Sequence, residues 1–325
     1  MHARLTVDVH LDPTELESEL RADVREGLGS RPYSLPPKWF YDAAGSELFD
    51  RITTLEEYYP TEAERSALRH CADLIVTTSG ADTVMELGSG SSDKTRVLLD
   101  AFAAAGQLER YVPFDVSETA LRNAADALVT RYPDLEVHGV VGDFDRHLDQ
   151  LPADGHRLLM FLGGTLGNYT PGPRATLLAQ MAATLRAGEW LLLGTDLVKD
   201  RDRLVTAYDD PAGVTAAFNL NVLKVVNREL GADFDVAAFR HVAVWNDESE
   251  WIEMRLRAEH DMTVHIPSLD LEVPLRAGEE ILTEVSAKFR REGITAELAT
   301  AGFEVVDWWT DPAGEFALSL SRRSG

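Results

Sequence analysis

The central part of the chain alternates short apolar runs with longer segments in which apolar and charged positions recur at helical spacing. The apolar runs predict strands at 83–87, 111–115, 137–141, 158–162 and 190–194. The segments between them predict helices at 94–105, 118–130 and 173–186. Because short strands that alternate with crossover helices pair in parallel, this pattern predicts a parallel sheet with helices on both faces.

Polar residues mark the predicted starts of two helices. Thr61 is followed three residues later by Glu64, which predicts a capping box and a helix that continues to about residue 76. Thr170 precedes Pro171, so Thr170 is expected to cap the helix that follows. Nearer the N-terminus, residues 14–28 predict an amphipathic surface helix.

The pattern changes after residue 199. Long helices are predicted within about 202–230 and strands at 241–247, 251–257 and 281–289. Alternation then resumes with a helix at 294–301 and two strands, 303–309 and 315–321, joined by a short turn. These two strands predict an antiparallel hairpin at the sheet edge, and a parallel sheet that ends in such a hairpin is typical of the class I methyltransferase fold.

The predicted fold class is therefore α/β, a Rossmann-like, mostly parallel sheet with a second α+β domain. Residues 62–198 and 288–325 are expected to form the methyltransferase domain. Residues 1–61 and 199–287 are expected to form the second, substrate-binding domain. A cleft between the two domains is the expected substrate site.

Composition narrows the function classes. The 325 residues include 31 Lys and Arg against 55 Asp and Glu, a formal net charge of −24. Such an acidic chain repels phosphate backbones and anionic lipid, so nucleic-acid and membrane roles are not expected. The single cysteine, Cys71, cannot form an intrachain disulfide, and no metal site is predicted. We expect a cytoplasmic monomer that acts on a small molecule.

Three predicted strand ends carry residues suited to a nucleoside ligand. Glu86 begins a Gly-rich loop with Gly88 and Gly90, where the backbone can turn tightly and approach a ligand. Asp115, at the end of the second strand, suits the two hydroxyls of a ribose. Asp143 and Phe144, after the third strand, suit the amino group and the face of an adenine.

Two details of the loop favour S-adenosylmethionine (SAM) over a dinucleotide. Asp93 stands where the dinucleotide pattern has its third glycine. The acidic Glu86 opposes a pyrophosphate but suits a cationic sulfonium.

Several longer motifs, taken together, are more specific than this loop. The chain resembles the histidine N-alpha-methyltransferases of ergothioneine biosynthesis, in their actinobacterial form, from about residue 20 to 322. The motifs that carry the resemblance are LPPKWFYDAAGSELF (35–49), EYYPTE (57–62), ELGSG (86–90), FLGGTLGN (161–168), GTDLVKD (194–200), AYDD (207–210), GVTAAFN (213–219) and LTEVSAKF (282–289).

The resemblance implies a two-domain enzyme that transfers three methyl groups from SAM to the α-amine of L-histidine, forming hercynine. It implies that Asn168 holds the amine and carboxylate side of the substrate and that Tyr41 lies near the amine. Tyr208, helped by Thr215, would bind the carboxylate. Ring recognition and cofactor binding would use two further sets: Glu284, Ser286, Tyr58 and Met254 for the imidazole, and Gly88, Lys94, Asp115, Asp143 and Phe144 for SAM.

Other interpretations remain open at this point. Glu284 and Ser286 lie two positions apart on a predicted strand, which suits either a solvated face or two groups aimed at one ligand. Single tyrosines such as Tyr41 are ordinarily core residues with a wet hydroxyl. The nearest alternative function is methylation of another amino acid, such as tryptophan or a derivative. An NAD-dependent oxidoreductase or a non-catalytic nucleotide binder is a further alternative from a different class.

Overall fold

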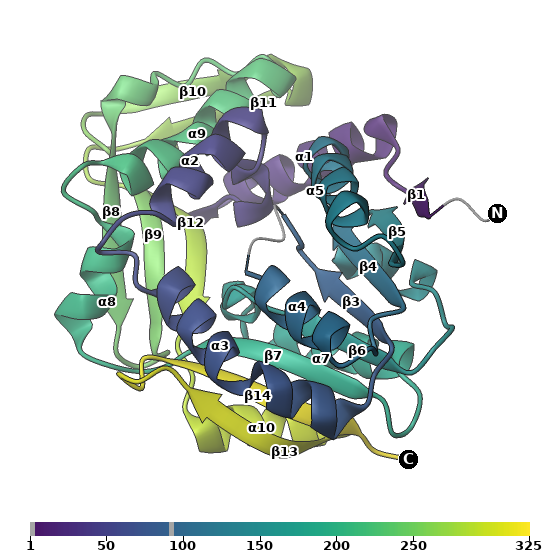
Figure 1. Cartoon of the computed structure of the whole chain (residues 1–325). Coiled ribbons are helices and arrows are strands. Elements are labelled where there is room, and N and C mark those ends of the chain that lie inside the picture. The colour runs from purple at the N-terminus through teal and green to yellow at the C-terminus, as the bar shows by residue number, and fades with distance from the viewer. Residues whose placement is uncertain (1–3, 91–93) are drawn as a thin grey trace. The chain divides into compact units, whose positions relative to one another are not determined.

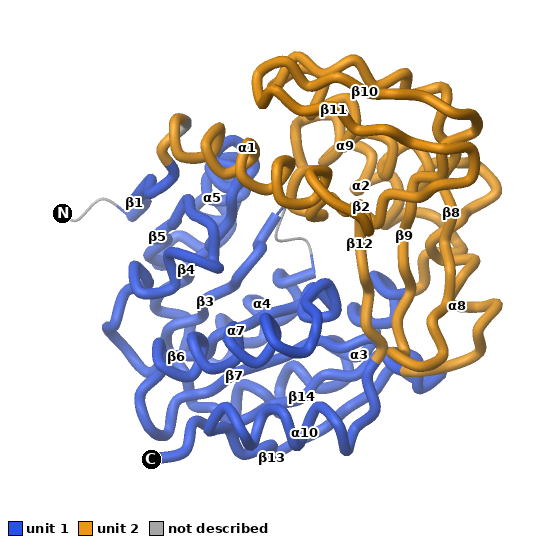
Figure 2. Tube along the Cα trace, turned by 180° about the vertical axis from the view of Figure 1, so that it is seen from behind, with its two compact units in different colours: residues 1–11, 60–197, 289–325 blue, residues 12–59, 198–288 orange. Residues whose placement is uncertain are grey.

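The computed structural model describes residues 4–90 and 94–325 and divides into two compact units. Unit 1 comprises residues 1–11, 60–197 and 289–325, and unit 2 comprises residues 12–59 and 198–288 (Figure 2). Residues 1–61 were predicted to lie in the second domain. The first eleven residues instead belong to unit 1, because strand β1 (Leu5–Val9) pairs in parallel with β5 (Glu136–Val141).

Unit 1 is built around a sheet of eight strands within the described residues. Their order is β1-β5-β4-β3-β6-β7-β14-β13, and neighbours are parallel up to β7. The edge hairpin is antiparallel, as predicted, because β14 pairs antiparallel with both β7 and β13. The remaining strands are β3 (Thr83–Leu87), β4 (Arg110–Asp115), β6 (Arg157–Phe161), β7 (Trp190–Asp196), β13 (Phe303–Thr310) and β14 (Phe316–Arg323).

Helices cover both faces of this sheet (Figures 1 and 2). Strands β3, β6 and β7 are buried along their whole length, which is expected of parallel strands between two helical layers. The helical elements of unit 1 are α3 (Pro60–Ser79), α4 (Arg96–Ala104), α5 (Glu118–Arg131), α6 (Phe144–His147), η2 (Leu148–Gln150), η3 (Thr165–Asn168), α7 (Pro171–Thr184) and α10 (Arg291–Thr300).

Of the two predicted caps, Thr61 is not at a cap position, whereas Thr170 is. Helix α3 already begins at Pro60, so Thr61 lies inside its first turn and Glu64 makes other contacts, described below. Thr170 occupies the cap position of α7 with an extended backbone, but its side chain makes no capping hydrogen bond. The capping box at Thr61 and Glu64 was therefore wrong, whereas the position of Thr170 as the N-cap of α7 is confirmed without a side-chain hydrogen bond.

Unit 2 combines a four-stranded sheet, a two-stranded hairpin and several helices. The larger sheet has the order β2-β12-β9-β8, and β10 pairs antiparallel with β11. The strands are β2 (Tyr33–Ser34), β8 (Phe239–Asn246), β9 (Trp251–Ala258), β10 (Met262–Ile266), β11 (Leu271–Leu275) and β12 (Glu280–Ala287). The helical elements are α1 (Pro13–Gly29), η1 (Pro37–Phe40), α2 (Ala43–Ile52), α8 (Arg201–Tyr208), α9 (Val214–Leu230), η4 (Val236–Ala238) and η5 (Pro267–Leu269).

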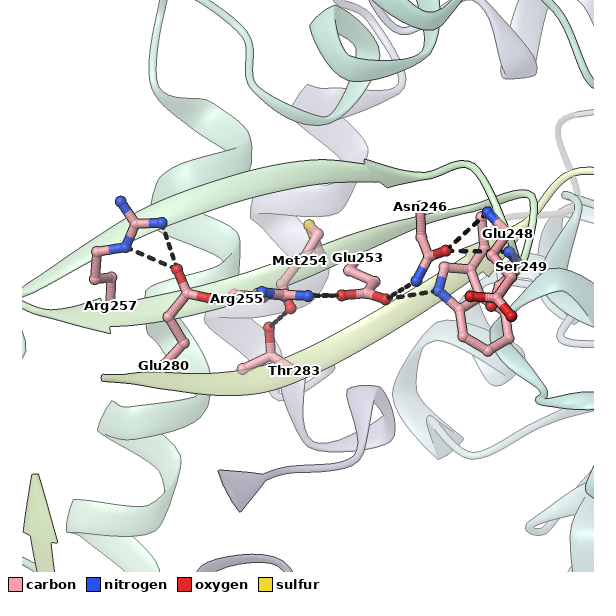
Figure 3. A network of polar contacts seen from close by, with 10 residues as sticks. Asn246, Glu248, Ser249, Glu253, Met254, Arg255, Arg257, Glu280 and Thr283 are labelled. Carbon is pink, nitrogen blue, oxygen red and sulfur yellow. Dashed lines mark hydrogen bonds and ion pairs between the residues drawn. The ribbon is translucent and has the colours of Figure 1, made fainter. Parts of the chain in front are cut away.

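A ladder of ion pairs follows one face of the β9–β12 pair (Figure 3). Glu280 accepts from Arg255 (Nη1–Oε2 2.6 Å) and from Arg257, and Arg255 also bonds Glu253. Glu253 in turn accepts from Asn246 (3.0 Å). Because side chains alternate along a strand, the residues between these, such as Met254, face the opposite side.

No helix in the described part of the chain is both long and apolar enough to span a membrane.

Candidate active site

The Gly-rich loop of unit 1 lies where β3 ends and is joined to the end of β4. Gly88 (φ 67°) and Gly90 (φ 48°) have left-handed backbones that a side chain would strain. The N–H of Gly88 donates to the carbonyl of Phe114 (2.8 Å), and the N–H of Gly90 donates to Asp115 Oδ2 (2.8 Å). The structure thus brings together three predicted cofactor residues. Asp93, which was compared above with the third glycine of the dinucleotide pattern, lies outside the described residues, as do Ser91 and Ser92 before it.

Asp115 is the polar centre of this loop cluster. Its second oxygen, Oδ1, accepts from the N–H of Ser117 (2.9 Å), so the carboxylate joins the ends of two loops. Burial raises the pKa of Asp115, and the backbone N–H donors of Ser117 and Gly90 oppose that rise. A half-buried carboxylate whose orientation is fixed in this way can accept hydrogen bonds from the hydroxyls of a bound sugar.

The end of β5 supplies the next pair of predicted residues. The N–H of Gly142 donates to the carbonyl of Asp115 (3.0 Å), which sets the two strand ends side by side. Asp143 caps α6 by accepting from the N–H of Asp145 (2.9 Å). The ring of Phe144 is half-buried between Phe114 (6.5 Å between centroids) and Phe161 (5.5 Å).

Glu86, predicted to contact the cofactor, is hydrogen-bonded within its own chain. Its carboxyl is buried and accepts from the hydroxyl of Thr95 (2.5 Å) and from that of Tyr111. Burial raises its pKa to about 7, although both hydrogen bonds act in the opposite direction. Because both oxygens of Glu86 accept hydrogen bonds from its own chain, the carboxyl stabilises the start of the loop. This geometry does not favour direct contact with a sulfonium.

Lys94 and Glu64 form an ion pair that the sequence analysis missed. Glu64 lies on α3, fully buried, and one of its oxygens bonds the ammonium of Lys94. Its other oxygen accepts from the N–H of Gly163 (2.7 Å), in the turn that follows β6. Glu64 therefore links the segment before α4 to the loop that carries Asn168, and the ammonium predicted to hold the cofactor is paired with it.

Asn168 ends the short helix η3, after a turn in which Gly163 (φ 79°) and Gly164 (φ 69°) are left-handed. Its side chain is half-buried and makes no hydrogen bond with the residues that the structure describes. The next residue, Tyr169, donates its hydroxyl to Asp145 (2.9 Å) and so ties this loop to the α6 turn. Asn168 lies beyond the carboxyl end of the parallel strand β6, which is where ligands bind in such sheets.

These strand ends fit SAM. At Gly88 and Gly90 an added Cβ would meet none of the described atoms within 4 Å, so the loop leaves open space in front of its backbone. Around that space lie an oriented carboxylate, Asp115, and the half-buried ring of Phe144. An acceptor for ribose hydroxyls and an aromatic face for a base are the groups that an adenosine needs.

In unit 2 the predicted ring-binding residues share one face of β12. A β-bulge between Leu282 and Glu284 shifts the register, so that Glu284 then pairs with Met254 and Ser286 with Ile252. Residues paired in this way point to the same face, and bulges re-aim the side chains beside them. Glu284, Ser286 and Met254 are all buried there.

Glu284 is a buried carboxyl with unused hydrogen-bonding capacity within the described residues. It is 8% exposed, and no hydrogen bond joins it to any residue in the described part of the chain. Burial raises its pKa to about 7, while the charge of Lys288 acts in the opposite direction. Leaving a buried acceptor unpaired costs about 1–3 kcal/mol, so this group is suited to accept a hydrogen bond from a ligand.

Tyr208, Ser286 and Lys288 form a buried triad beside this face. The Tyr208 hydroxyl and Ser286 Oγ are 2.8 Å apart, and Lys288 Nζ donates to both, at 2.8 and 2.9 Å. Lys288 also lies over the Tyr208 ring (4.6 Å). The motif 282–289 contained Lys288, but the residue spacing alone did not suggest a contact with Tyr208, which is 80 positions away.

Aromatic rings connect the remaining predicted residues. Tyr58 lies edge-on to Tyr208 (6.2 Å) and to Phe49 (6.3 Å). Tyr41 contacts Phe49 (5.6 Å) and Phe218 (5.4 Å). Phe49 and Phe218 were not predicted as members of this cluster, although they lie in the motifs 35–49 and 213–219.

A second polar network holds Tyr208 and the bulge in place. Asn219 donates to His241 Nδ1 (2.8 Å) and accepts from the hydroxyl of Thr283 (2.6 Å). His241 Nε2 then donates to the backbone carbonyl of Tyr208 (2.8 Å). Burial lowers the pKa of His241, which favours this neutral tautomer. Thr215, in the first turn of α9, is buried, and its N–H donates to Asp210 (2.7 Å).

Known proteins match this chain over nearly its whole length. It matches the family described as histidine-specific methyltransferase, SAM-dependent, over residues 20–323. It is 60% identical to the histidine N-alpha-methyltransferase of Mycolicibacterium smegmatis, over 94% of this chain and 95% of that protein. The protein of the same name from Mycobacterium tuberculosis is 55% identical, over 98% of this chain and the whole of that protein.

A fungal relative is longer. Ergothioneine biosynthesis protein 1 of Neurospora crassa is 30% identical over 99% of this chain, which corresponds to 36% of that protein. The strand order of unit 1, with its antiparallel final hairpin, is the class I methyltransferase arrangement that the sequence predicted. The chain belongs to the SAM-dependent, histidine-specific methyltransferases.

Proposed function

We propose that the protein transfers three methyl groups from SAM to the α-amino group of L-histidine and so makes hercynine, the first step of ergothioneine biosynthesis. The observation that carries the choice of substrate is Glu284, a buried carboxyl without a hydrogen-bond partner in the described residues, two positions from the Ser286 hydroxyl. An imidazole offers one N–H and one acceptor nitrogen, which this pair complements.

Unit 1 is proposed to bind the cofactor. SAM, when bound, supplies an electrophilic methyl group on a good leaving group. Asp115 is placed to accept from the ribose hydroxyls, Asp143 from the adenine amino group, and Phe144 to pack on the base. Gly88 and Gly90 leave room for close approach of the ligand to the backbone. Lys94, paired with Glu64, positions the loop and is available to a carboxylate of the ligand only in competition with that pair.

Unit 2 is proposed to bind the amino acid. Glu284 and Ser286 read the two ring nitrogens, and Met254 packs beside them. The phenol of Tyr208, the hydroxyl of Thr215 and the ring of Tyr58 are proposed to hold the carboxylate side and the edge of the substrate. Anchors at the ring and carboxylate leave the nitrogen free to gain methyl groups.

The amine itself must be neutral for its lone pair to attack. Asn168, whose side chain makes no hydrogen bond within the described residues, is proposed to orient the amine. Tyr41 is proposed to lie near the amine. Holding two reactants in near-attack geometry can supply about 7–11 kcal/mol of the barrier. Holding the amine and the methyl group in this geometry is therefore the main contribution of the chain to catalysis. We also propose that the protein acts as a cytoplasmic monomer.

The runner-up is methylation of another amino acid, such as tryptophan or a derivative. An indole offers one N–H and no acceptor nitrogen, so Ser286 would be left without a ligand partner. The buried carboxyl of Glu284 beside a second polar group therefore favours histidine.

Mass spectrometry of free amino acids incubated with the protein and SAM tests this proposal. We expect histidine to gain one, two and finally three methyl groups, and Asp115→Ala to slow all three steps together. Equal methylation of tryptophan, or no methylated histidine at saturating SAM, would contradict it.

A further inference from the structure

The β-bulge in β12 determines which face of the sheet Glu284 occupies. Before the bulge Glu280 pairs with Arg257, and after it Glu284 pairs with Met254. Arg257 and Met254 lie three positions apart on β9, so they point to opposite faces. Their partners follow them, which puts Glu280 on the face of the ion-pair ladder and Glu284 on the other one. Because the two glutamates are four positions apart, regular alternation would place both on the ladder face.

The residue that makes this difference is Thr283, which has no pairing partner in the register of β12 with β9. Its side chain is 1% exposed, and its hydroxyl lies 2.6 Å from Asn219 Oδ1 and 2.9 Å from the carbonyl of Met254 (Figure 3). Asn219 Nδ2 in turn donates to the carbonyl of Arg255 (3.2 Å). Side-chain donors thus reach two consecutive carbonyls of β9 opposite the bulge, where the regular ladder is disrupted.

The orientation of the Asn219 amide follows from its other neighbour, His241. The ring nitrogen Nε2 of His241 faces the carbonyl of Tyr208 (2.8 Å), so Nε2 carries the hydrogen and Nδ1 is an acceptor. Asn219 Nδ2 donates to this Nδ1 (2.8 Å), which leaves Oδ1 for the hydroxyl of Thr283. Asn219 is fully buried on α9, 64 positions before the bulge that it contacts.

We propose that Asn219 is a positioning residue for substrate selectivity: by holding Thr283 in the bulge, it keeps the Glu284 carboxyl on the Met254 face, where it accepts from the N–H of the substrate imidazole. The inference rests on the proposed function and deepens it. Ring recognition then depends in part on a residue that acts through the backbone of β12. Loss of the hydrogen bonds at the bulge lets the strand relax toward regular pairing, which turns Glu284 away from that face.

Two replacements of Thr283 separate hydrogen bonding from packing. Thr283→Val keeps the shape and loses the hydroxyl, whereas Thr283→Ser keeps the hydroxyl and loses a methyl group. Histidine affinity is measured by calorimetry on the full-length protein at saturating S-adenosylhomocysteine. We expect Thr283→Val to weaken histidine binding about 10-fold and Thr283→Ser to stay within about threefold of the wild type, because the hydroxyl makes the contact with Asn219. A role in packing alone predicts the reverse order, since only Thr283→Ser leaves a cavity.

A double-mutant cycle shows whether the effect acts through Glu284. Thr283→Val in the Glu284→Ala background should weaken histidine binding by no more than about threefold, because the carboxyl that the bulge positions is then absent. The affinity for S-adenosylhomocysteine should stay within about twofold in every variant, because the proposed cofactor residues belong to unit 1.

Asn227 provides a matched control for Asn219 on the same helix. In the described part of unit 2, its amide bonds the backbone of Phe234 twice (2.8 and 2.9 Å). Asn219→Leu should weaken histidine binding about 10-fold or more, since it removes the contact with Thr283, whereas Asn227→Leu should stay within about threefold of the wild type. If Asn219→Leu does not fold, the order of the two Thr283 variants decides the question by itself.

Four outcomes would overturn the inference: unchanged histidine affinity in Thr283→Val, a larger loss in Thr283→Ser than in Thr283→Val, effects of Thr283→Val and Glu284→Ala that multiply, or equal losses in the two asparagine variants. Failure of the proposed function is distinguishable, because the wild type itself would then bind no histidine.

Discussion

Two buried glutamates, one in each unit, show how differently the candidate residues of the two units are held. Glu86 in unit 1 and Glu284 in unit 2 both have a pKa raised to about 7 by burial. Glu86 accepts from the hydroxyls of Thr95 and Tyr111, whereas Glu284 has no hydrogen bond within the described residues. The first carboxyl is satisfied by the fold, and the second is complete only with a ligand.

The same difference extends to the surroundings of each residue. At the cofactor end, loops are fixed largely by backbone N–H groups, as at Asp115, which accepts from Gly90 and Ser117. At the substrate end, side chains bond one another, as in the triad of Lys288, Tyr208 and Ser286. In a side-chain network the members polarise one another, so the loss of one affects the others.

The largest expected effect is on stability at Glu86. Glu86→Ala leaves the hydroxyls of Thr95 and Tyr111 without their acceptor and opens a cavity, which together cost about 2–5 kcal/mol. Urea unfolding of Glu86→Ala and Glu284→Ala should show a clear loss for the first and a much smaller change for the second. Equal losses would remove the distinction between a bracing and a ligand-binding carboxyl.

The second effect is the pH dependence of stability at Glu284. Its pKa is raised from 4.5 to about 7, so between these values the folded protein holds a proton that the unfolded chain has lost. Stability contributed by this proton is present below pH 4.5 and is lost as the pH rises through about 7, in total about 3 kcal/mol.

Glu284→Gln removes this titration, whereas Glu86 titrates in both proteins and cancels from the difference. The free energy of unfolding of the variant, relative to the wild type, should therefore increase between pH 4 and 8 by up to about 3 kcal/mol. A difference that does not vary with pH would show that Glu284 is paired in solution.

A third effect concerns cofactor affinity. Asp115→Ala loses charge-assisted hydrogen bonds worth about 1.5–3 kcal/mol, or about 10- to 150-fold in the affinity for S-adenosylhomocysteine. Calorimetry on the folded variant measures this directly. Unchanged affinity would remove Asp115 from the cofactor site.

The smallest effect is expected for substrates that already carry methyl groups. Nα,Nα-dimethylhistidine keeps its ring and carboxylate, so its kcat/KM should lie within about tenfold of that for histidine. Steady-state kinetics with both compounds measures the ratio. A dimethyl compound that binds but does not react would indicate that the anchors surround the nitrogen.

The fold was largely predictable from the hydrophobic pattern, and its exceptions have physical reasons. Strand β3 matches its predicted range of 83–87, because a buried parallel strand is a continuous apolar run between turn residues. Strand β1 was missed because it lies at the edge of the sheet, where none of its five residues is buried and three are exposed. The hairpin of β10 and β11 was missed for a similar reason, since four of the ten residues in its two strands are exposed.

The site was predictable where spacing along one strand decides geometry, as for Glu284 and Ser286. It was not predictable where partners come from distant elements. Glu64 looked like a helix-capping residue, yet its oxygens bond Lys94 and the N–H of Gly163, 99 positions away. Glu86 was predicted to contact the ligand because it begins the loop. In the fold, its carboxyl accepts hydrogen bonds from the hydroxyls of Thr95 and Tyr111, which come from other elements.

The most direct test of the account is the ratio of kcat/KM for histidine to that for tryptophan, in the wild type and in Glu284→Ala. Loss of one charge-assisted hydrogen bond should lower kcat/KM for histidine about 10- to 150-fold. Tryptophan should gain relative to histidine, because the change removes a buried carboxyl and opens space. The account predicts a ratio that falls at least tenfold with S-adenosylhomocysteine affinity intact. A ratio that stays constant would mean that the substrate ring is recognised elsewhere in the molecule.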